Sequence, residues 1–317
     1  MRHLSAWIIV GSALAIAACG ARSQLNPGGT EQEGGAPGTG PGVGAGPTAT
    51  TGGGGTGGEG GEGEGGEGGA PFDDCTDPDV TFIYLVTSSF GMYAFKPASQ
   101  ELEYRGQLNC PTGASPFSMA VSRAGTAYVV FNDGTLWEAD VTDATCADTP
   151  YLSGQNGFNT FGMGYALDDG EMSETLYVSD IDYENDTTKG LGRIDTDSFD
   201  LDVLGPLQNP LGFRIELTGL GTDLYAFIID EAAGGGHLAQ VDKEMGGIFD
   251  PVAVPIGTDI GSWHFAFWGG EFYFFTSQGA DPTTTVRRYD PETTALVTVG
   301  TVPESVVGAG ASTCAPR

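Results

Sequence analysis

Residues 126–131 read TAYVVF, a run of β-branched and aromatic side chains around Tyr128, and this pattern occurs five times along the chain. The other copies are FIYLVT (82–87), TLYVSD (175–180), DLYAFIID (223–230) and EFYFFTS (271–277). Successive tyrosines lie 44, 49, 48 and 48 residues apart. Such runs favour β-strands, and a period of this length is typical of one four-stranded blade of a β-propeller.

Two further columns flank the tyrosine runs. An aromatic residue precedes four of them, in the segments PFSMAV, TFGMGYA, GFRIEL and SWHFAFW. An aspartate follows an apolar residue after four of them, at Asp140, Asp195, Asp242 and Asp290, and Lys96 takes this place in the first repeat. An aspartate here can accept hydrogen bonds from its own backbone and set a tight turn. Residues 72–317 are therefore predicted to form an all-β, five-bladed β-propeller with strands A to D in each blade.

The first repeat lacks its A strand, because it begins with the tyrosine run soon after Cys75. Residues 305–312, SVVGAGAS, come about one blade interval after Trp263 and supply the missing strand. We expect this C-terminal strand to complete the first blade and close the ring. No sheet edge would then stay open at the seam.

The N-terminus, residues 1–18, is predicted to be a lipoprotein signal peptide. Arg2 precedes an apolar run at 7–18, shorter than the roughly 20 residues of a membrane-spanning helix and typical of an export signal. Residues 16–19, IAAC, resemble the lipobox of bacterial lipoproteins. This resemblance implies cleavage before Cys19 and the addition of acyl chains, such as palmitate, to its thiol and new amino group. The alternative is an ordinary signal peptide with a chance cysteine.

The residue after Cys19 is Gly20, not the aspartate associated with inner-membrane retention of lipoproteins. The resemblance therefore implies a lipid anchor in the outer membrane, with the protein facing the periplasm or the cell surface. Each buried methylene of an acyl chain contributes about 0.8 kcal/mol, so several chains together hold the protein stably.

Residues 19–71 are predicted to be the lipidated cysteine and a disordered Gly/Glu-rich tether. Of the 53 glycines in the chain, 23 lie between residues 20 and 71. This composition buries too little apolar surface to offset the entropy of the chain. A Gly-rich coil of about 50 residues reaches roughly 40 Å, so its expected role is distance from the membrane.

The chain has 42 acidic and 12 basic residues, a formal net charge of −30. Such a surface repels phosphate backbones and anionic headgroups, which excludes nucleic acid as a partner. We expect contact with the membrane through the lipid anchor only, and a small molecule, a glycan or a protein as the ligand.

The cysteine positions make a disulfide prediction. With Cys19 lipidated, four cysteines remain. Cys314 follows the closing strand and Cys75 precedes the first tyrosine run, two positions that would share one tight turn in an unbroken blade, so we pair them. Elimination then pairs Cys110 with Cys146, which links the outer regions of blades one and two. The sequence has no C-x-x-C pair, and the mature chain has two histidines, so no zinc site is expected.

Candidate ligand-binding residues are those that depart from the repeat near the axis. In a propeller the D–A and B–C loops share the usual ligand face, and the positions just below its mouth favour small residues. Ser118 is such a residue and is itself a candidate for ligand binding. Arg214, Glu216 and His264 depart from this rule. They suggest an anion- or sugar-binding centre with Arg214 as a donor and His264 as a candidate acid or base. The alternatives are a buried Arg214–Glu216 contact with water in the channel and, for the further candidate His237, a half-exposed surface histidine.

Acidic side chains alternate along the B–C loop of blade three, at Asp180, Asp182, Glu184 and Asp186. They resemble the start of calcium loops, because hard cations bind several carboxylate oxygens. The full pattern is not met, since Asn185 stands at the glycine turn position and no glutamate stands at position twelve. A calcium site and a solvated acidic loop both stay open.

The sequence has no nucleophile elbow and no phosphate-binding loop, so it favours a binding or scaffolding module over an enzyme. The alternative is a propeller hydrolase or lyase acting on carbohydrate or lactone, by analogy of fold. Paired-acid glycosidases need carboxyl groups roughly 5–9.5 Å apart, and Glu216, Asp230 and Asp182 are the candidates. A third alternative is passive spacing or adhesion.

Taken together, the lipobox, the Gly-rich tether, FSMAV (117–121), FGMGYA (161–166) and GAGASTCAP (308–316) resemble uncharacterised predicted lipoproteins of myxobacteria. The resemblance covers nearly all of residues 72–317. It implies a β-propeller-like domain and transfers no activity and no functional residue.

Overall fold

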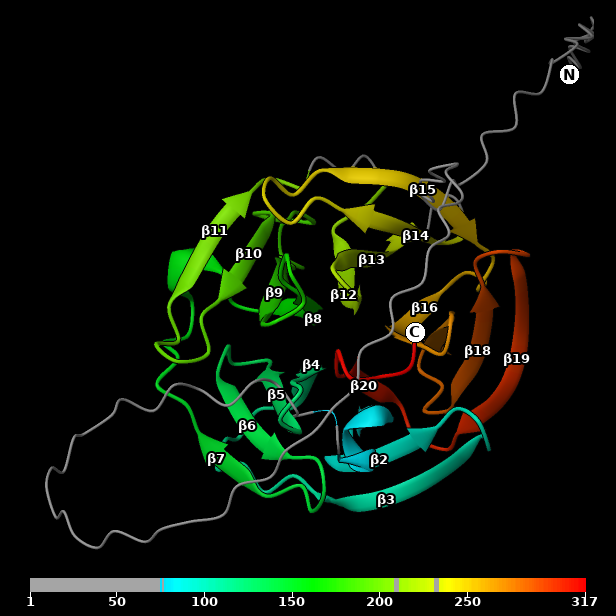
Figure 1. Cartoon of the computed structure of the whole chain (residues 1–317), viewed down its shortest axis with the longest axis horizontal. Helices are drawn as coiled ribbons and strands as arrows, with labels where there is room; N and C mark the ends of the chain where they lie inside the picture. Colours follow the sequence, from blue (N-terminus) through cyan, green and yellow to red (C-terminus); the bar gives the residue numbers. More distant parts are fainter. Residues whose placement is uncertain (1–74, 76, 208–210, 231–233) are drawn as a thin grey trace, which may run out of the picture. The chain divides into compact units, whose positions relative to one another are not determined.

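The computed structural model describes residues 75, 77–207, 211–230 and 234–317. The predicted signal peptide, Cys19 and the tether lie outside these described residues. The described strands form five four-stranded sheets placed around a ring (Figure 1). The five-bladed propeller expected from the tyrosine period is therefore confirmed. Within the described ranges, no helix combines the length and the hydropathy needed to cross a membrane.

In each blade one strand lies nearest the axis, and the other three follow outward in the order of sheet pairing (Figure 1). From the axis outward, blade one contains β20 (Val306–Ala311), β1 (Ile83–Thr87), β2 (Gly91–Lys96) and β3 (Glu101–Gln107). Blade two contains β4 (Pro116–Val121), β5 (Thr126–Phe131), β6 (Leu136–Asp140) and β7 (Cys146–Asp148); blade three contains β8 (Phe161–Leu167), β9 (Glu174–Asp180), β10 (Leu191–Ile194) and β11 (Leu201–Gly205). Blade four contains β12 (Arg214–Leu220), β13 (Asp223–Asp230), β14 (Gly235–Val241) and β15 (Ile248–Val254); blade five contains β16 (Ile260–Trp268), β17 (Glu271–Gln278), β18 (Thr284–Asp290) and β19 (Ala295–Val302).

The ring is closed by pairing the two ends of the domain. The C-terminal strand β20 runs antiparallel to β1, with Ile83 opposite Ala311 and Leu85 opposite Ala309. In Figure 1 the red β20 accordingly lies with the cyan strands of blade one. The prediction that residues 305–312 complete the first blade is confirmed, and the inner edge of β1 is paired.

The hydrophobic core consists of five clusters, each between two neighbouring blades. Between blades four and five, for example, the rings of Phe227 and Phe265 lie with centroids 5.6 Å apart. Between blades five and one, Phe95 and Phe275 lie 5.7 Å apart. Each blade thus packs both faces of its sheet against its neighbours. The inner strand β8 is buried along its whole length, whereas the outer strand β3, at the rim of the ring, is largely exposed.

Glycines allow the inner strands to approach one another closely. A Cβ atom added to Gly164 on β8 would lie 2.5 Å from the carbonyl oxygen of Leu217 on β12, and one added to Gly162 would overlap the carbonyl oxygen of Ile215. Real side chains do not tolerate such contacts. The expectation that small residues suit the crowded axis therefore holds at these positions.

The repeated aspartates after the third strand set turns, as predicted. The Oδ1 atom of Asp140 accepts a hydrogen bond from the backbone N–H of Thr142 at 2.7 Å. Equivalent bonds to the backbone two residues on are made by Asp195, Asp242 and Asp290. These aspartates therefore have a structural role, and we do not count them among the candidate ligand-binding residues.

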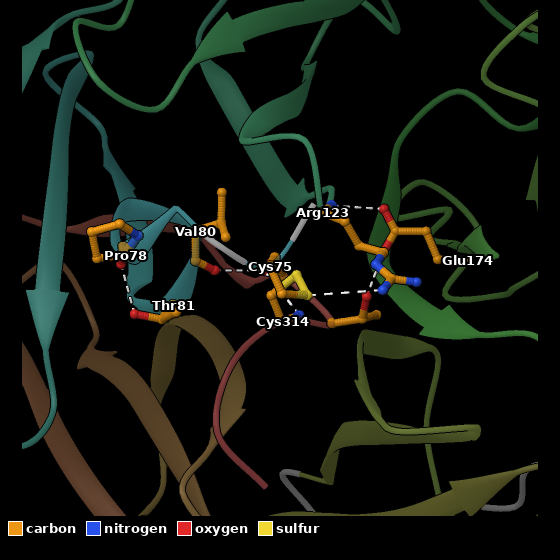
Figure 2. Close-up of a disulfide and its surroundings, with 9 residues drawn as sticks. Cys75, Pro78, Val80, Thr81, Arg123, Glu174 and Cys314 are labelled. Atoms are coloured by element: carbon orange, nitrogen blue, oxygen red, sulfur yellow. Dashed lines mark hydrogen bonds between the residues drawn. A yellow bond between two sulfur atoms is a disulfide. The ribbon is translucent and has the colours of Figure 1, made fainter. Parts of the chain in front are cut away.

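Both predicted disulfides are present. Cys75 is bonded to Cys314 across the seam, with Cα atoms 5.2 Å apart, and Cys110 is bonded to Cys146 between blades one and two, with Cα atoms 5.1 Å apart. Figure 2 shows the seam disulfide beside Arg123, whose Nη2 donates to the sulfur of Cys75 at 3.8 Å. The two ends of the propeller domain are therefore held by a covalent bond as well as by strand pairing.

Candidate functional site

A cavity of about 130 Å³ lies at the axis, on the face formed by the D–A and B–C loops. The inner strands contribute Phe117, Glu216, Trp263 and His264. The loops after β5 and β9 contribute Asn132 and Tyr183. This is the face on which the sequence placed the candidate ligand-binding residues.

Glu216 lies in the middle of β12, opposite Phe227 on β13, and is 2% exposed. Its Oε2 atom accepts a hydrogen bond of 2.8 Å from the hydroxyl of Ser118 on β4. Ser118 is fully buried. Its Oε1 atom lies 3.2 Å from Nδ1 of His264 on β16. Three residues singled out separately in the sequence, from blades two, four and five, thus meet at one point.

Three buried polar atoms at this point have no hydrogen-bond partner among the described residues: Oε1 of Glu216, Nδ1 of His264 and Nε1 of Trp263. The Oε1–Nδ1 pair has the distance of an ion pair but not the alignment of a hydrogen bond. A buried polar group without a partner costs about 1–3 kcal/mol. A ligand that supplies the missing hydrogen bonds would recover this free energy on binding.

Arg214 begins β12 and lies beside the cavity. Its guanidinium group packs over the ring of Trp263, 4.9 Å from the centroid, and its Nη1 donates to the backbone oxygen of Ile260 at 3.3 Å. The contacts of Glu216 at the cavity are with Ser118 and His264, and an Arg214–Glu216 contact stays a prediction. Arg214 therefore positions the Trp263 ring at the cavity wall by a cation–π contact.

Tyr183 covers the mouth of the cavity. Its ring makes edge contacts with Phe117, Phe213 and Trp263, with centroids 6.0, 6.0 and 6.2 Å away. Four blades thus contribute to one aromatic cluster. Although the residue is 45% exposed, desolvation raises the pKa of its hydroxyl, the charge of Arg214 lowers it and that of Glu216 raises it. The hydroxyl therefore stays protonated at neutral pH.

Sequence reasoning missed Tyr183, because the residue lies inside the acidic loop that was considered for calcium. The available signal was an aromatic residue at the tip of a polar loop on the ligand face. The partners that give it a role, Phe117, Phe213 and Trp263, come from other blades. Their meeting depends on the tertiary structure.

The four acidic residues of that loop do not converge. Asp180 is 2% exposed, its Oδ2 accepts a hydrogen bond from the backbone N–H of Lys189, and burial raises its pKa. Oδ1 of Asp182 caps the backbone N–H groups of Glu184 and Asn185. Among the described residues no group of three His, Cys, Asp or Glu side chains is placed to hold a metal ion. Turn formation accounts for these contacts, and calcium binding by Asp180, Asp182, Glu184 and Asp186 stays a prediction.

The remaining candidates lie outside the axial cavity. His237 is on β14, the third strand of blade four, opposite Ile228 and Ala253, and its Nδ1 is buried without a hydrogen-bond partner in the described part of the chain. Asp230 ends β13. Of the three carboxylates considered for a paired-acid mechanism, Glu216 is the one that lines the cavity, while Asp182 lines a neighbouring surface pocket.

No protein-family model matches the chain, and no curated protein matches its sequence. Several solved structures are similar to it. A chain of a nidogen/laminin complex is 14% identical, with a TM-score of 0.42, over 74% of this chain and 82% of that chain. The Dos1 propeller is 12% identical, with a TM-score of 0.37, over 74% and 70% of the two chains. TolB from Acinetobacter baumannii is 9% identical, with a TM-score of 0.40, over 69% and 53%.

Proposed function

We propose that this protein is an envelope-anchored lipoprotein whose propeller binds a small molecule or glycan in the axial cavity. One observation carries the proposal: Ser118, Glu216 and His264 meet at a cavity where three buried polar atoms lack hydrogen-bond partners among the described residues. A polar group buried in this way has a free-energy cost that a bound ligand removes.

The anchor is supported by the lipobox at residues 16–19 and by Gly20. The proposed location is the outer membrane, with the propeller facing the periplasm or the cell surface. The net charge of −30 supports a partner that is neither nucleic acid nor an anionic lipid surface. Acylation is tested by incorporation of alkyne-labelled palmitate, which we expect in the wild type and not in Cys19→Ala. Labelling of both proteins would contradict it.

The binding function is tested by thermal unfolding of the detergent-solubilised full chain with a panel of mono- and oligosaccharides and small metabolites. A ligand at about 100 times its dissociation constant stabilises the native state by about 2.7 kcal/mol, which raises the midpoint by several degrees. We expect such a shift in the wild type and its loss in Glu216→Gln. Glu244→Gln, in the exposed turn between β14 and β15, is the matched control and should keep the shift. A panel without any Glu216-dependent shift would overturn the proposal.

A further inference from the structure

A second pocket, of about 550 Å³, adjoins the axial cavity on the same face. Its lining includes Asn159, Thr160 and Lys189, from the loops of blades two and three. Tyr183 and Asn132 line both this outer pocket and the axial cavity. The ring of Tyr183 therefore forms part of the partition between the two spaces.

The sizes of the two spaces indicate what the partition does. Ligand pockets usually enclose about 300–1,000 Å³, so the outer pocket is large enough alone and the axial cavity, at about 130 Å³, is not. The Tyr183 ring lines both spaces and stands between them. Its withdrawal would add the volume of the ring to the axial cavity and join the two spaces, which would leave room for one sugar ring beside Phe117 and Trp263.

The loop that carries Tyr183 is closed at its base by backbone contacts and is exposed at its tip. At its base, the backbone N–H of Ile181 donates to the carbonyl oxygen of Thr160 at 2.9 Å, and Asp182 pairs with Thr187 as an isolated bridge. Residues 183–186 beyond this bridge are exposed. Movement of the tip would carry Tyr183 out of the aromatic cluster and leave the base in place.

The unsatisfied atoms at the axis select the chemistry of the ligand. Oε1 of Glu216 is an acceptor, Nε1 of Trp263 is a donor, and Nδ1 of His264 can be either. An ammonium group donates only and a phosphate or carboxylate accepts only, so each would leave one atom without a partner. A hydroxyl group both donates and accepts, and adjacent hydroxyls on a ring can satisfy all three atoms.

The surrounding charges disfavour an acidic ligand. The two spaces are lined by the carboxyl groups of Asp180, Asp182, Glu184 and Glu216. The cations beside them are the ammonium group of Lys189 in the lining and the guanidinium group of Arg214 over the Trp263 ring, so acidic side chains outnumber basic ones. The resulting field repels anions. The aromatic rings at the partition provide flat apolar walls, which suit the C–H face of a neutral sugar ring.

Resting on the proposed function, we infer that the axial cavity and the outer pocket are two parts of one site for a neutral oligosaccharide. Its terminal ring enters the aromatic cluster by displacing Tyr183, and the rings behind it lie in the outer pocket. Tyr183 is thus a plug that the ligand must remove.

The test uses the detergent-solubilised full chain and a panel of neutral disaccharides and trisaccharides, with sulfated and amino derivatives as comparators. Binding is followed by calorimetry and by tryptophan fluorescence, because Trp263 lines the site. We expect Tyr183→Ala to bind the same neutral sugar about fivefold more tightly, since a closed state that must be opened weakens apparent affinity in proportion to its population. Tyr104→Ala, which removes an exposed tyrosine on β3, is the matched control and should bind as the wild type does.

Three results would count against the inference. An unchanged or weaker affinity of Tyr183→Ala, with an unaltered circular dichroism spectrum, would show that Tyr183 is not a plug. Binding of sulfated or amino derivatives, or of compounds other than sugars, in preference to neutral sugars would overturn the ligand class and leave the proposed binding function standing. The absence of any Glu216-dependent binding would overturn both.

Discussion

Glu216 is the residue on which the chemistry of the axial cavity depends. Glu216 stands opposite the residue two after the repeated tyrosine, and at this register position the other inner strands carry Ser118, Gly162, His264 and Gly308. Glu216 places a carboxylate there, 2% exposed, and one of its oxygens is held by Ser118. The departure from the repeat is visible in the sequence. The partners of the carboxylate are not, because they come from blades far away along the chain.

We predict that Ser118→Ala lowers the free energy of unfolding by about 2 kcal/mol, because the buried Oε2 atom of Glu216 loses its hydrogen bond and is left unsatisfied. Urea-induced unfolding followed by circular dichroism measures the change. Ser99→Ala removes a hydroxyl that donates to an exposed glutamate, and we expect it to cost about 0.5 kcal/mol or less. Equal losses in the two variants would contradict a structural role for the Ser118–Glu216 bond.

A second buried carboxylate gives a prediction about pH. Burial raises the pKa of Glu174 from 4.5 to about 7, although its two oxygens accept hydrogen bonds of 2.7 Å from the Arg123 backbone and the Thr313 hydroxyl. A raised pKa means that the folded state favours the protonated carboxyl group. The contribution of Glu174 to the free energy of unfolding is therefore complete below pH 4.5 and is lost as the pH rises through 7. Asp168 adds to the raised pKa and the charge of Arg123 opposes it.

We therefore predict that the unfolding free energy of the wild type falls by about 3 kcal/mol from pH 4.5 to pH 8 relative to Glu174→Gln, which carries no charge at any pH. Thermal unfolding across this range measures the difference. The exposed variant Glu244→Gln serves as the control and should follow the wild-type profile. Parallel profiles for the wild type and Glu174→Gln would contradict the assignment.

Among the elements, the strands and turns agree closely with those predicted from the sequence, whereas the roles of the loop side chains do not. The tyrosine runs became β1, β5, β9, β13 and β17, because alternating β-branched and aromatic side chains suit a sheet buried on both faces. The loop after β9 was considered for its carboxylates, whereas the residue that reaches the site from it is Tyr183. Loop side chains take their roles from the neighbouring blades, which local sequence does not describe.

We expect the two disulfides to contribute unequally to the free energy of unfolding. The Cys75–Cys314 bond closes a separation of 239 residues, and the Cys110–Cys146 bond closes one of 36. By the chain-entropy argument the first contributes about 5 kcal/mol and the second about 4 kcal/mol. We predict that Cys75→Ala/Cys314→Ala is less stable in denaturant than Cys110→Ala/Cys146→Ala by about 1–2 kcal/mol. A larger loss from the second pair would show that local packing outweighs loop closure.

At the scale of the whole molecule, the ring depends on its last strand. β20 pairs with β1 and contributes Val306 and Ala309 to the cluster between blades five and one. Its Gly308 lies against Met119 on β4, where an added Cβ would come within 2.9 Å of the methionine Cβ. Blade one therefore depends on both ends of the domain, and its neighbours depend on blade one.

We predict that truncation after Pro303 abolishes cooperative unfolding and gives aggregated protein in size-exclusion chromatography, because the edge of β1 is then unpaired. Truncation after Cys314 is the control. It removes the backbone hydrogen bonds from Ala315 to Ser312 and from Gly269 to Pro316, and the exposed Arg317–Glu171 ion pair. We expect it to cost about 1–2 kcal/mol. Cooperative unfolding of the shorter chain would contradict the closing role of β20.

The number of blades, the closing strand, the Asp turns and both disulfide pairings were predictable from the amino-acid sequence. These features follow from the period of a repeat and from positions within it, which are local properties of the chain. That Ser118, Glu216 and His264 share one cavity, and that Tyr183 covers it, became visible in the folded chain. The three residues stand at one register position, each opposite the residue two after the repeated tyrosine. Because the blades converge at the axis, side chains at this position meet across repeats, and their contacts depend on distances between blades that local sequence does not describe.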